Sequence, residues 1–255
     1  MNLVIDWGNS SLKVGWFEGL ALTETRYHMS SDDLQELLTE QIRKGRQPDR
    51  VIVSSTSRPG EELRSQVAEL GTGMADTTNW LLFETTTPVP VTIDYDTPLT
   101  LGTDRIAAAV GATVLFPGEH CLVIDMGTCI TADIVDGGRV FRGGLISPGL
   151  RMRFRGMHTF TERLPLIEPD LQSVRQLPPL TGRNTQQAML SGAINGMLFE
   201  LNGIIAAHRN ERPDLKVVVC GGDALFFESR LKPPIFVAPE VVLIGLNRIL
   251  EHNVK

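Results

Sequence analysis

Short apolar runs separated by polar and glycine-rich segments predict a chain of alternating strands and helices. Leu3-Val4-Ile5 and the alternating segment 12–17 predict a strand and its return, joined by a hairpin turn at Gly8-Asn9, because both turn residues tolerate positive φ. Residues 51–53, 81–83 and 217–219 are apolar and predict further buried strands.

Helical periodicity fills much of the remaining chain. The predicted helices cover residues 32–44 (capped by Ser31 or Asp32), 60–70, 103–116, 150–160, 185–208 (capped by Thr185) and 241–252. Proline-rich stretches at 85–100 and 165–179 predict irregular loops, and Gly143-Gly144 and Pro148-Gly149 predict two turns.

The opening strand has a second copy near the middle of the chain. Leu122-Val123-Ile124-Asp125-x-Gly127 repeats Leu3-Val4-Ile5-Asp6-x-Gly8 at five of the six positions, and a second strand (130–135) follows it. Coincidence is the alternative, since an apolar strand followed by Asp and Gly is common. Duplication explains both copies better, and predicts two like domains, 1–117 and 118–255, divided at Pro117-Gly118.

Composition narrows the class of protein. With 255 residues, 42% of them hydrophobic and 21% charged, the chain is expected to fold as a soluble protein. A net charge of −6 argues against a nucleic-acid partner. The three cysteines show no zinc-ligand spacing, and the longest uncharged apolar run, 106–116, is too short to span a membrane. A cytoplasmic protein without a membrane anchor is therefore expected.

The two strand–Asp–Gly hairpins suit phosphate chemistry. Backbone N–H groups of small residues can bind an anion, which favours Gly8, Asn9 and Ser10 in the first copy and Gly127 with Thr128 in the second. Asp6 and Asp125 at strand ends can hold a cation or its waters, and Lys13 can place a point charge near a phosphate.

Gly102-Thr103-Asp104-Arg105 opens the predicted helix 103–116. One interpretation is a helix cap with a salt bridge. The other is a general base, Asp104, beside a carboxylate or phosphate clamp, Arg105. The chain has neither a P-loop nor a G-x-G-x-x-G motif, and residues 144–149 lack the spacing of a nucleophile elbow.

Taken together, these motifs resemble those of type III pantothenate kinases. The resemblance covers essentially the whole chain and rests on Asp6-x-Gly8-Asn9-Ser10-x-x-Lys13, Gly102-x-Asp104-Arg105, Asp125-x-Gly127-Thr128-x-x-Thr131, Gly143-Gly144-x-Ile146-x-Pro148-Gly149, Thr185, Gly192 and Cys220-Gly221-Gly222-Asp223. Ser10 stands where the family usually has Thr, and Trp7 and Cys129 replace smaller residues.

The resemblance implies the α/β fold of the actin-like, sugar-kinase superfamily: two ribonuclease-H-like domains with a nucleotide cleft between them. It implies ATP-dependent phosphorylation of pantothenate, the first step of coenzyme A synthesis, by a homodimer that uses Mg²⁺ and a monovalent cation, K⁺ or NH₄⁺. The implied roles are ATP binding by Asp6, Gly8, Asn9, Ser10, Lys13, Thr128, Gly221 and Gly222; pantothenate binding by Tyr95, Gly102, Thr103, Asp104, Arg105 and Thr185; general-base catalysis by Asp104; monovalent-cation binding by Asp125; and magnesium binding by Asp6, directly or through water.

Two other functions fit the sequence less well. Another small-molecule kinase of the same superfamily would share the fold, because fold does not fix the substrate. A catalytically silent regulator would have no need to retain Asp6, Lys13, Asp104, Asp125 and Thr128 together.

Overall fold

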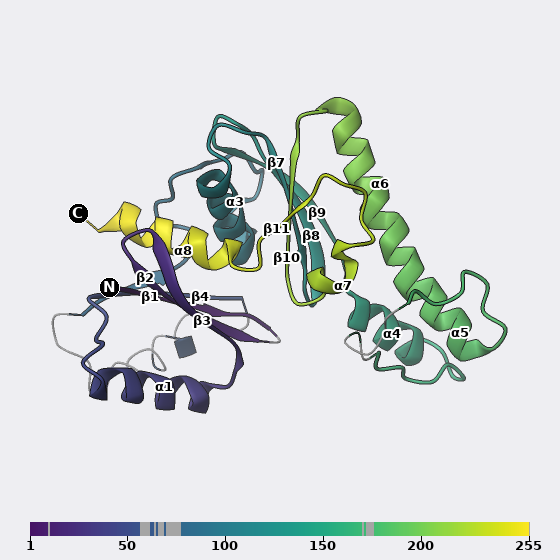
Figure 1. Cartoon of the computed structure of the whole chain (residues 1–255), viewed down its shortest axis with the longest axis horizontal. Coiled ribbons are helices and arrows are strands. Elements are labelled where there is room, and N and C mark those ends of the chain that lie inside the picture. Colours follow the sequence, from purple (N-terminus) through teal and green to yellow (C-terminus); the bar gives the residue numbers. More distant parts are fainter. Residues whose placement is uncertain are drawn as a thin grey trace. The chain divides into compact units, whose positions relative to one another are not determined.

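The structure is a computed structural model that describes residues 1–9, 11–56, 62, 63, 65, 69, 78–169, 171 and 176–254 (Figure 1). It separates into two compact units. Unit 1 contains Met1–Pro117, Gly138–Arg142 and Glu240–Lys255, and unit 2 contains Gly118–Gly137 and Gly143–Pro239. Ser10 and most of the predicted helix 60–70 lie outside the described residues.

Unit 1 is built on a five-stranded sheet in the order β3-β2-β1-β4-β5. The strands are β1 (Asn2–Trp7), β2 (Leu12–Glu18), β3 (Ala21–Met29), β4 (Arg50–Ser55) and β5 (Asn79–Phe83). β1 pairs antiparallel with β2, as the hairpin pattern predicts, and parallel with β4. The carboxyl ends of β1 and β4 therefore lie side by side.

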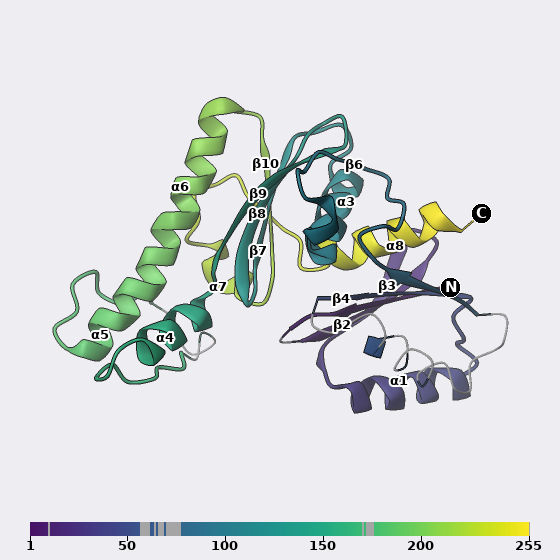
Figure 2. The ribbon, with the colours of Figure 1, turned by 180° about the vertical axis from the view of Figure 1, so that it is seen from behind.

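Helices cover both faces of this sheet (Figures 1 and 2). On one face, Leu3 and Ile5 of β1 pack with Leu34 and Leu38 of α1 (Ser31–Arg43). On the other face lie α3 (Thr103–Leu115) and α8 (Val241–Asn253). Because side chains alternate along a strand, Asp6 belongs to the α3 and α8 face, together with Asn2, whose amide donates to Asn247 of α8.

α3 and α8 approach each other closely because glycines lie at the contact. A Cβ on Gly111 would come within 2.0 Å of the Val241 carbonyl oxygen, and one on Gly245 within 1.8 Å of the Ala107 oxygen. Neither helix has room for a methyl group there. The α8 segment belongs to unit 1 by its contacts, although it comes from the C-terminal end of the chain.

The sheet of unit 2 repeats the strand order of unit 1. Its strands run β9-β8-β7-β10-β11. They are β7 (Cys121–Met126), β8 (Cys129–Val135), β9 (Val140–Pro148, of which unit 2 contains the part from Gly143 on), β10 (Lys216–Cys220) and β11 (Phe236–Val237). β7 pairs antiparallel with β8 and parallel with β10, as β1 does with β2 and β4. The first residues of β9 lie in unit 1, where Val140 and Phe141 pair with β6 (Thr92–Ile93). The shared order supports the duplication that the sequence predicts.

The helices of unit 2 are α4 (Leu150–Thr159), α5 (Thr185–Leu190), which continues through a π-helical turn (Ser191–Asn195) into α6 (Gly196–Glu211), and α7 (Ala224–Glu228). The core of this unit lies between them and one face of the sheet. Alternate residues of β7 point to that face, and they pack with residues from α4, α6 and α7, of which one is named here for each helix. The strand residues are Leu122, Ile124 and Met126, and the helix residues are Phe154, Leu201 and Phe227.

Predictions of one turn and two helix caps were wrong. Gly143-Gly144 does not form a turn, because β9 runs through it: a Cβ on Gly144 would lie 2.1 Å from the Ala132 oxygen, so the glycine serves close strand packing. The cap of α1 is Ser30, whose hydroxyl accepts from Asp33 N. The cap of α5 is Asn184, which accepts from Gln187 N, and not Thr185.

The glycine contact between α3 and α8 predicts a large asymmetry between two Gly→Ala substitutions. Gly245→Ala should destabilise the protein by about 2–3 kcal/mol, because the methyl group meets backbone atoms that cannot rotate away. Gly203→Ala in α6 is the control: its Cβ would meet nothing within 4 Å, so it should stabilise by up to about 1 kcal/mol. Thermal unfolding midpoints measure both, and equal midpoints for the two variants would contradict the packing.

Candidate functional site

The first hairpin places a lysine directly opposite a buried aspartate. Asp6 at the end of β1 is 5% exposed and is the register partner of Lys13 in β2. The Lys13 Nζ lies 3.8 Å from Asp6 Oδ2, which offsets the cost of burying the carboxylate. Both residues were singled out from the sequence, and the strand register brings them together.

The hairpin turn is built differently from the prediction. Gly8 does not have positive φ; its N–H donates to the Ser11 oxygen at 3.0 Å, and a Cβ there would lie 3.1 Å from the same oxygen. Glycine is thus favoured by the tight turn. Asn9, at the tip, is exposed.

Ser54 connects this hairpin to α3, and sequence reasoning missed it. It is fully buried at the carboxyl end of β4, next to Asp6 in the parallel register. Its hydroxyl donates to Thr103 Oγ1 at 3.0 Å, at the first residue of α3. One sequence signal could have identified Ser54: it is a hydroxyl residue directly after the apolar run 51–53, and this run was predicted to be a buried strand like the one that ends at Asp6.

Asp104 lies in the first turn of α3 with its carboxylate folded back onto the helix start. Oδ1 accepts a hydrogen bond from Arg105 N at 2.8 Å. A Cβ on Gly102 would lie 2.4 Å from that oxygen, so glycine is required for this position of the carboxylate. The carboxyl group is therefore oriented by local structure and remains partly exposed.

Arg105 lies beside Asp104 but is only 6% exposed. Its Cζ lies 5.8 Å from the ring centroid of Tyr95 and 5.8 Å from that of Phe141. The start of α3 and the Tyr95 ring therefore lie close together within unit 1, as a shared binding site requires. Phe141 was not singled out from the sequence.

The second hairpin, in unit 2, has the same aspartate but a different partner. Asp125 of β7 pairs in register with Thr131, where the first hairpin has Lys13. Gly127 N donates to the Cys129 oxygen at 3.0 Å, and Thr128 at the tip is exposed. The strand–Asp–Gly motif thus opens a hairpin twice, but the second turn is one residue shorter and its aspartate faces a neutral residue.

Gly221 and Gly222 follow β10, and the structure requires glycine only at the first of these positions. Gly221 has φ +92°, and a Cβ on it would lie 2.5 Å from Asp125 Oδ1. A Cβ on Gly222 would meet nothing within 4 Å. Gly221 therefore serves close packing against β7, whereas Gly222 leaves open space beside it.

Thr185 is exposed at the start of α5 in unit 2, whereas the other predicted pantothenate residues lie in unit 1. Unit 1 by itself does not contain the complete predicted set.

Among the described residues, no group of three or more His, Cys, Asp or Glu side chains forms a metal site. Mg²⁺ fits this sparse donor set, because it commonly binds one or two carboxylates and completes its shell with water and substrate phosphates. Asp6 is a carboxylate suited to it in unit 1, and Asp125 stands at the corresponding position of unit 2.

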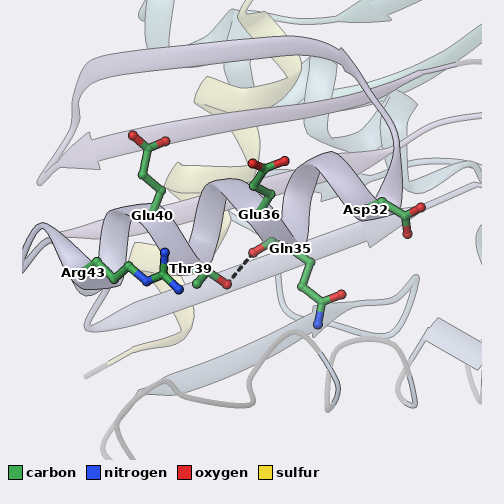
Figure 3. Close-up of a pocket in the computed structure, with 6 residues that line it drawn as sticks. All are labelled: Asp32, Gln35, Glu36, Thr39, Glu40 and Arg43. Atoms are coloured by element: carbon green, nitrogen blue, oxygen red, sulfur yellow. Dashed lines mark hydrogen bonds between the residues drawn. The ribbon is translucent and has the colours of Figure 1, made fainter.

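A surface concavity of about 490 Å³ on α1 is formed by other residues (Figure 3). Its walls are polar side chains from successive turns of this one helix: Asp32, Gln35, Glu36, Thr39, Glu40 and Arg43. It contains none of the predicted site residues, so the candidate site is assigned from the two hairpins and the start of α3.

Comparison with known proteins identifies the family. The sequence model of the type III pantothenate kinase family matches residues 2–207. The chain is 44% identical over 255 residues to a type III pantothenate kinase of Cytophaga hutchinsonii, covering all of both chains. It is 40% identical over 258 residues to one of Phocaeicola vulgatus, again covering all of both. The chain belongs to the type III pantothenate kinase family.

The fold agrees with this family membership. An inorganic polyphosphate/ATP-glucomannokinase from Arthrobacter sp. strain KM is similar in structure, with a TM-score of 0.51 at 13% identity, covering 99% of this chain and 98% of that one. At this identity the likeness shows the fold alone. The two-unit α/β fold of this chain is thus the fold of that kinase, as the sequence predicts.

Asp223 gives this family member a pH-dependent stability. Burial raises the pKa of its carboxyl group from 3.8 to about 6, against a smaller lowering by Arg151. The folded protein binds this proton more tightly than the unfolded chain does, so the stability from this proton is fully present below about pH 4 and is lost as the pH rises through about 6.

The Asp223→Asn variant cannot ionise, so it should not show this loss of folding stability, which is at most about 3 kcal/mol. The difference in unfolding midpoint, variant minus wild type, is expected to grow between about pH 4 and 6 and to level off above about pH 7. Asp214→Asn, at an exposed position of the same unit, controls for loss of one carboxylate. Parallel midpoint curves for wild type and Asp223→Asn would contradict the prediction.

Proposed function

We propose that this chain transfers the γ-phosphoryl group of ATP to the primary hydroxyl of pantothenate, the first step of coenzyme A synthesis. The observation that carries the proposal is full-length similarity to type III pantothenate kinases, together with an oriented carboxylate, Asp104, beside the buried cation of Arg105.

Asp104 is the proposed general base. It accepts the proton of the pantothenate hydroxyl as that oxygen forms a bond to the γ-phosphorus, and the bond from that phosphorus to the bridging oxygen breaks, leaving ADP with the electron pair. The hydrogen bond from Arg105 N to Oδ1 fixes the direction of the carboxylate. Such orientation lowers the entropic part of the barrier.

Arg105, Tyr95, Gly102, Thr103 and Thr185 are the proposed pantothenate-binding residues. A guanidinium group can bind a carboxylate through two parallel hydrogen bonds, which suits the carboxylate of pantothenate. Burial of Arg105 strengthens that interaction, because less water competes for the charge.

Each unit supplies its own groups for ATP. In unit 1, Gly8, Asn9, Ser10 and Lys13 are proposed to bind phosphate oxygens, and Asp6 to hold Mg²⁺ directly or through water. In unit 2, Thr128 is proposed to bind phosphate, Gly221 and Gly222 to adjoin the adenosine, and Asp125 to bind K⁺ or NH₄⁺. Bound Mg²⁺ would neutralise developing phosphate charge.

The proposal also includes a cytoplasmic homodimer. Its domains are 1–117 and 118–255, except that residues 138–142 and 240–255 group with the first domain. The helical segment Thr185–Glu211 is long and apolar enough to span a membrane, but half of its most apolar window is buried. Ile194, Met197 and Leu201 of this segment pack in the core of unit 2, which is the behaviour of a core helix.

Asp104→Asn is expected to reduce turnover by about 100-fold or more while ATP affinity stays unchanged, because the amide keeps an oxygen acceptor but cannot take the proton. The rate of ADP release that depends on added pantothenate measures turnover, and calorimetry measures ATP binding. Asp96→Asn, an exposed acid from the preceding segment, is the control and should retain activity. Full activity in Asp104→Asn would show that another group is the base.

Turnover is expected to require K⁺ or NH₄⁺ and to fall when Na⁺ is the only monovalent cation. Asp125→Asn should raise the K⁺ concentration needed for half-maximal rate, because it removes the ligand charge. The assay is run in each salt at constant ionic strength. Equal rates in K⁺ and Na⁺ would contradict the cation site, and no turnover in any salt from folded protein would favour a silent regulator or another acceptor.

A further inference from the structure

We propose that Phe141 is a positioning residue of the acceptor site, which holds the guanidinium group of Arg105 and the ring of Tyr95 in the arrangement that binds pantothenate. The inference rests on the proposed function, since Arg105 and Tyr95 are pantothenate-binding residues in that proposal.

Three side chains form a mutual cluster. The ring centroids of Phe141 and Tyr95 lie 6.0 Å apart with an interplanar angle of 65°, an edge-to-face arrangement. The Arg105 Cζ lies 5.8 Å from each of the two centroids. Each member therefore contacts both others, and Phe141 limits where the other two can move.

Burial strengthens these contacts. Phe141 is 0% exposed and Arg105 is 6% exposed. A cation near an aromatic ring is attracted more strongly where water is excluded. The rings therefore stabilise the charge of Arg105 at a place where desolvation alone would disfavour it.

The backbone around Phe141 is hydrogen-bonded to the segment that carries Tyr95. The Phe141 oxygen accepts from Asp94 N at 3.0 Å, and the Arg139 oxygen accepts from Thr92 N at 2.9 Å. Arg142 forms an ion pair with Asp94 at 2.6 Å. Although Gly138–Arg142 comes from the middle of the chain, it belongs to unit 1 with the acceptor residues.

The orientation of Arg105 matters because a guanidinium group is planar. Two parallel hydrogen bonds to a carboxylate form only when that plane has the right direction. Without the Phe141 ring the charge remains, but the plane is less constrained. We therefore expect weaker pantothenate binding with little change in the chemical step.

The test is steady-state kinetics of Phe141→Leu, which keeps an apolar side chain and removes the ring. The KM for pantothenate is expected to rise by about 2- to 30-fold, with the KM for ATP and kcat nearly unchanged. Phe17→Leu is the matched control, since Phe17 is also fully buried in unit 1 but belongs to β2. It should lower the unfolding midpoint without raising the KM for pantothenate.

A double-mutant cycle separates positioning from general stability. In an Arg105→Lys background, which already lacks the planar group, Phe141→Leu should raise the KM for pantothenate much less than in the wild type. Additive effects of the two substitutions on the KM for pantothenate would overturn the inference. So would a Phe141→Leu variant whose unfolding midpoint falls while its KM for pantothenate stays unchanged. Absence of pantothenate turnover in the wild type would instead overturn the proposed function.

Discussion

The contact between α3 and α8 is the constraint on which unit 1 depends. Helix axes usually lie further apart because side chains separate them, but Gly111 and Gly245 let backbone meet backbone here. The first turn of α3 carries Asp104 and Arg105, so the position of those residues follows from where α8 holds the helix. α8 in turn lies on β1, β2 and β4. A packing interaction far along the chain therefore fixes the position of the groups proposed for the acceptor site.

The two hairpins share one motif but give its aspartate different partners. Both place an aspartate at the end of a central strand, and both join that strand to an antiparallel neighbour. The partner of Asp6 is the cation Lys13, whereas the partner of Asp125 is the neutral Thr131. One hairpin motif therefore carries its aspartate in two different electrostatic environments.

Sequence patterns predicted the parts of the fold that local signals determine. The strand–Asp–Gly repeat, the helix beginning at Thr103 and the last helix all appear in the structure. Gly143-Gly144 was misread because a glycine pair suggests a turn, whereas close approach to Ala132 is a tertiary requirement. The two-residue strands β6 and β11 are defined by their partners and have no periodicity of their own. Phe141 was missed because its role also depends on a tertiary contact. No signal in the neighbouring sequence indicates that residues 138–142 belong to unit 1.

The first residues of the chain have a buried link to the last helix. Asn2 donates to both Asn247 and Glu251, so β1 reaches its final environment only when α8 is present. During synthesis on the ribosome, the strand that carries Asp6 emerges long before the helix that covers it. Unit 1 can complete its core only after α8 has left the exit tunnel. Truncated translation products should therefore lack an assembled acceptor site, even when every residue of that site has already been made.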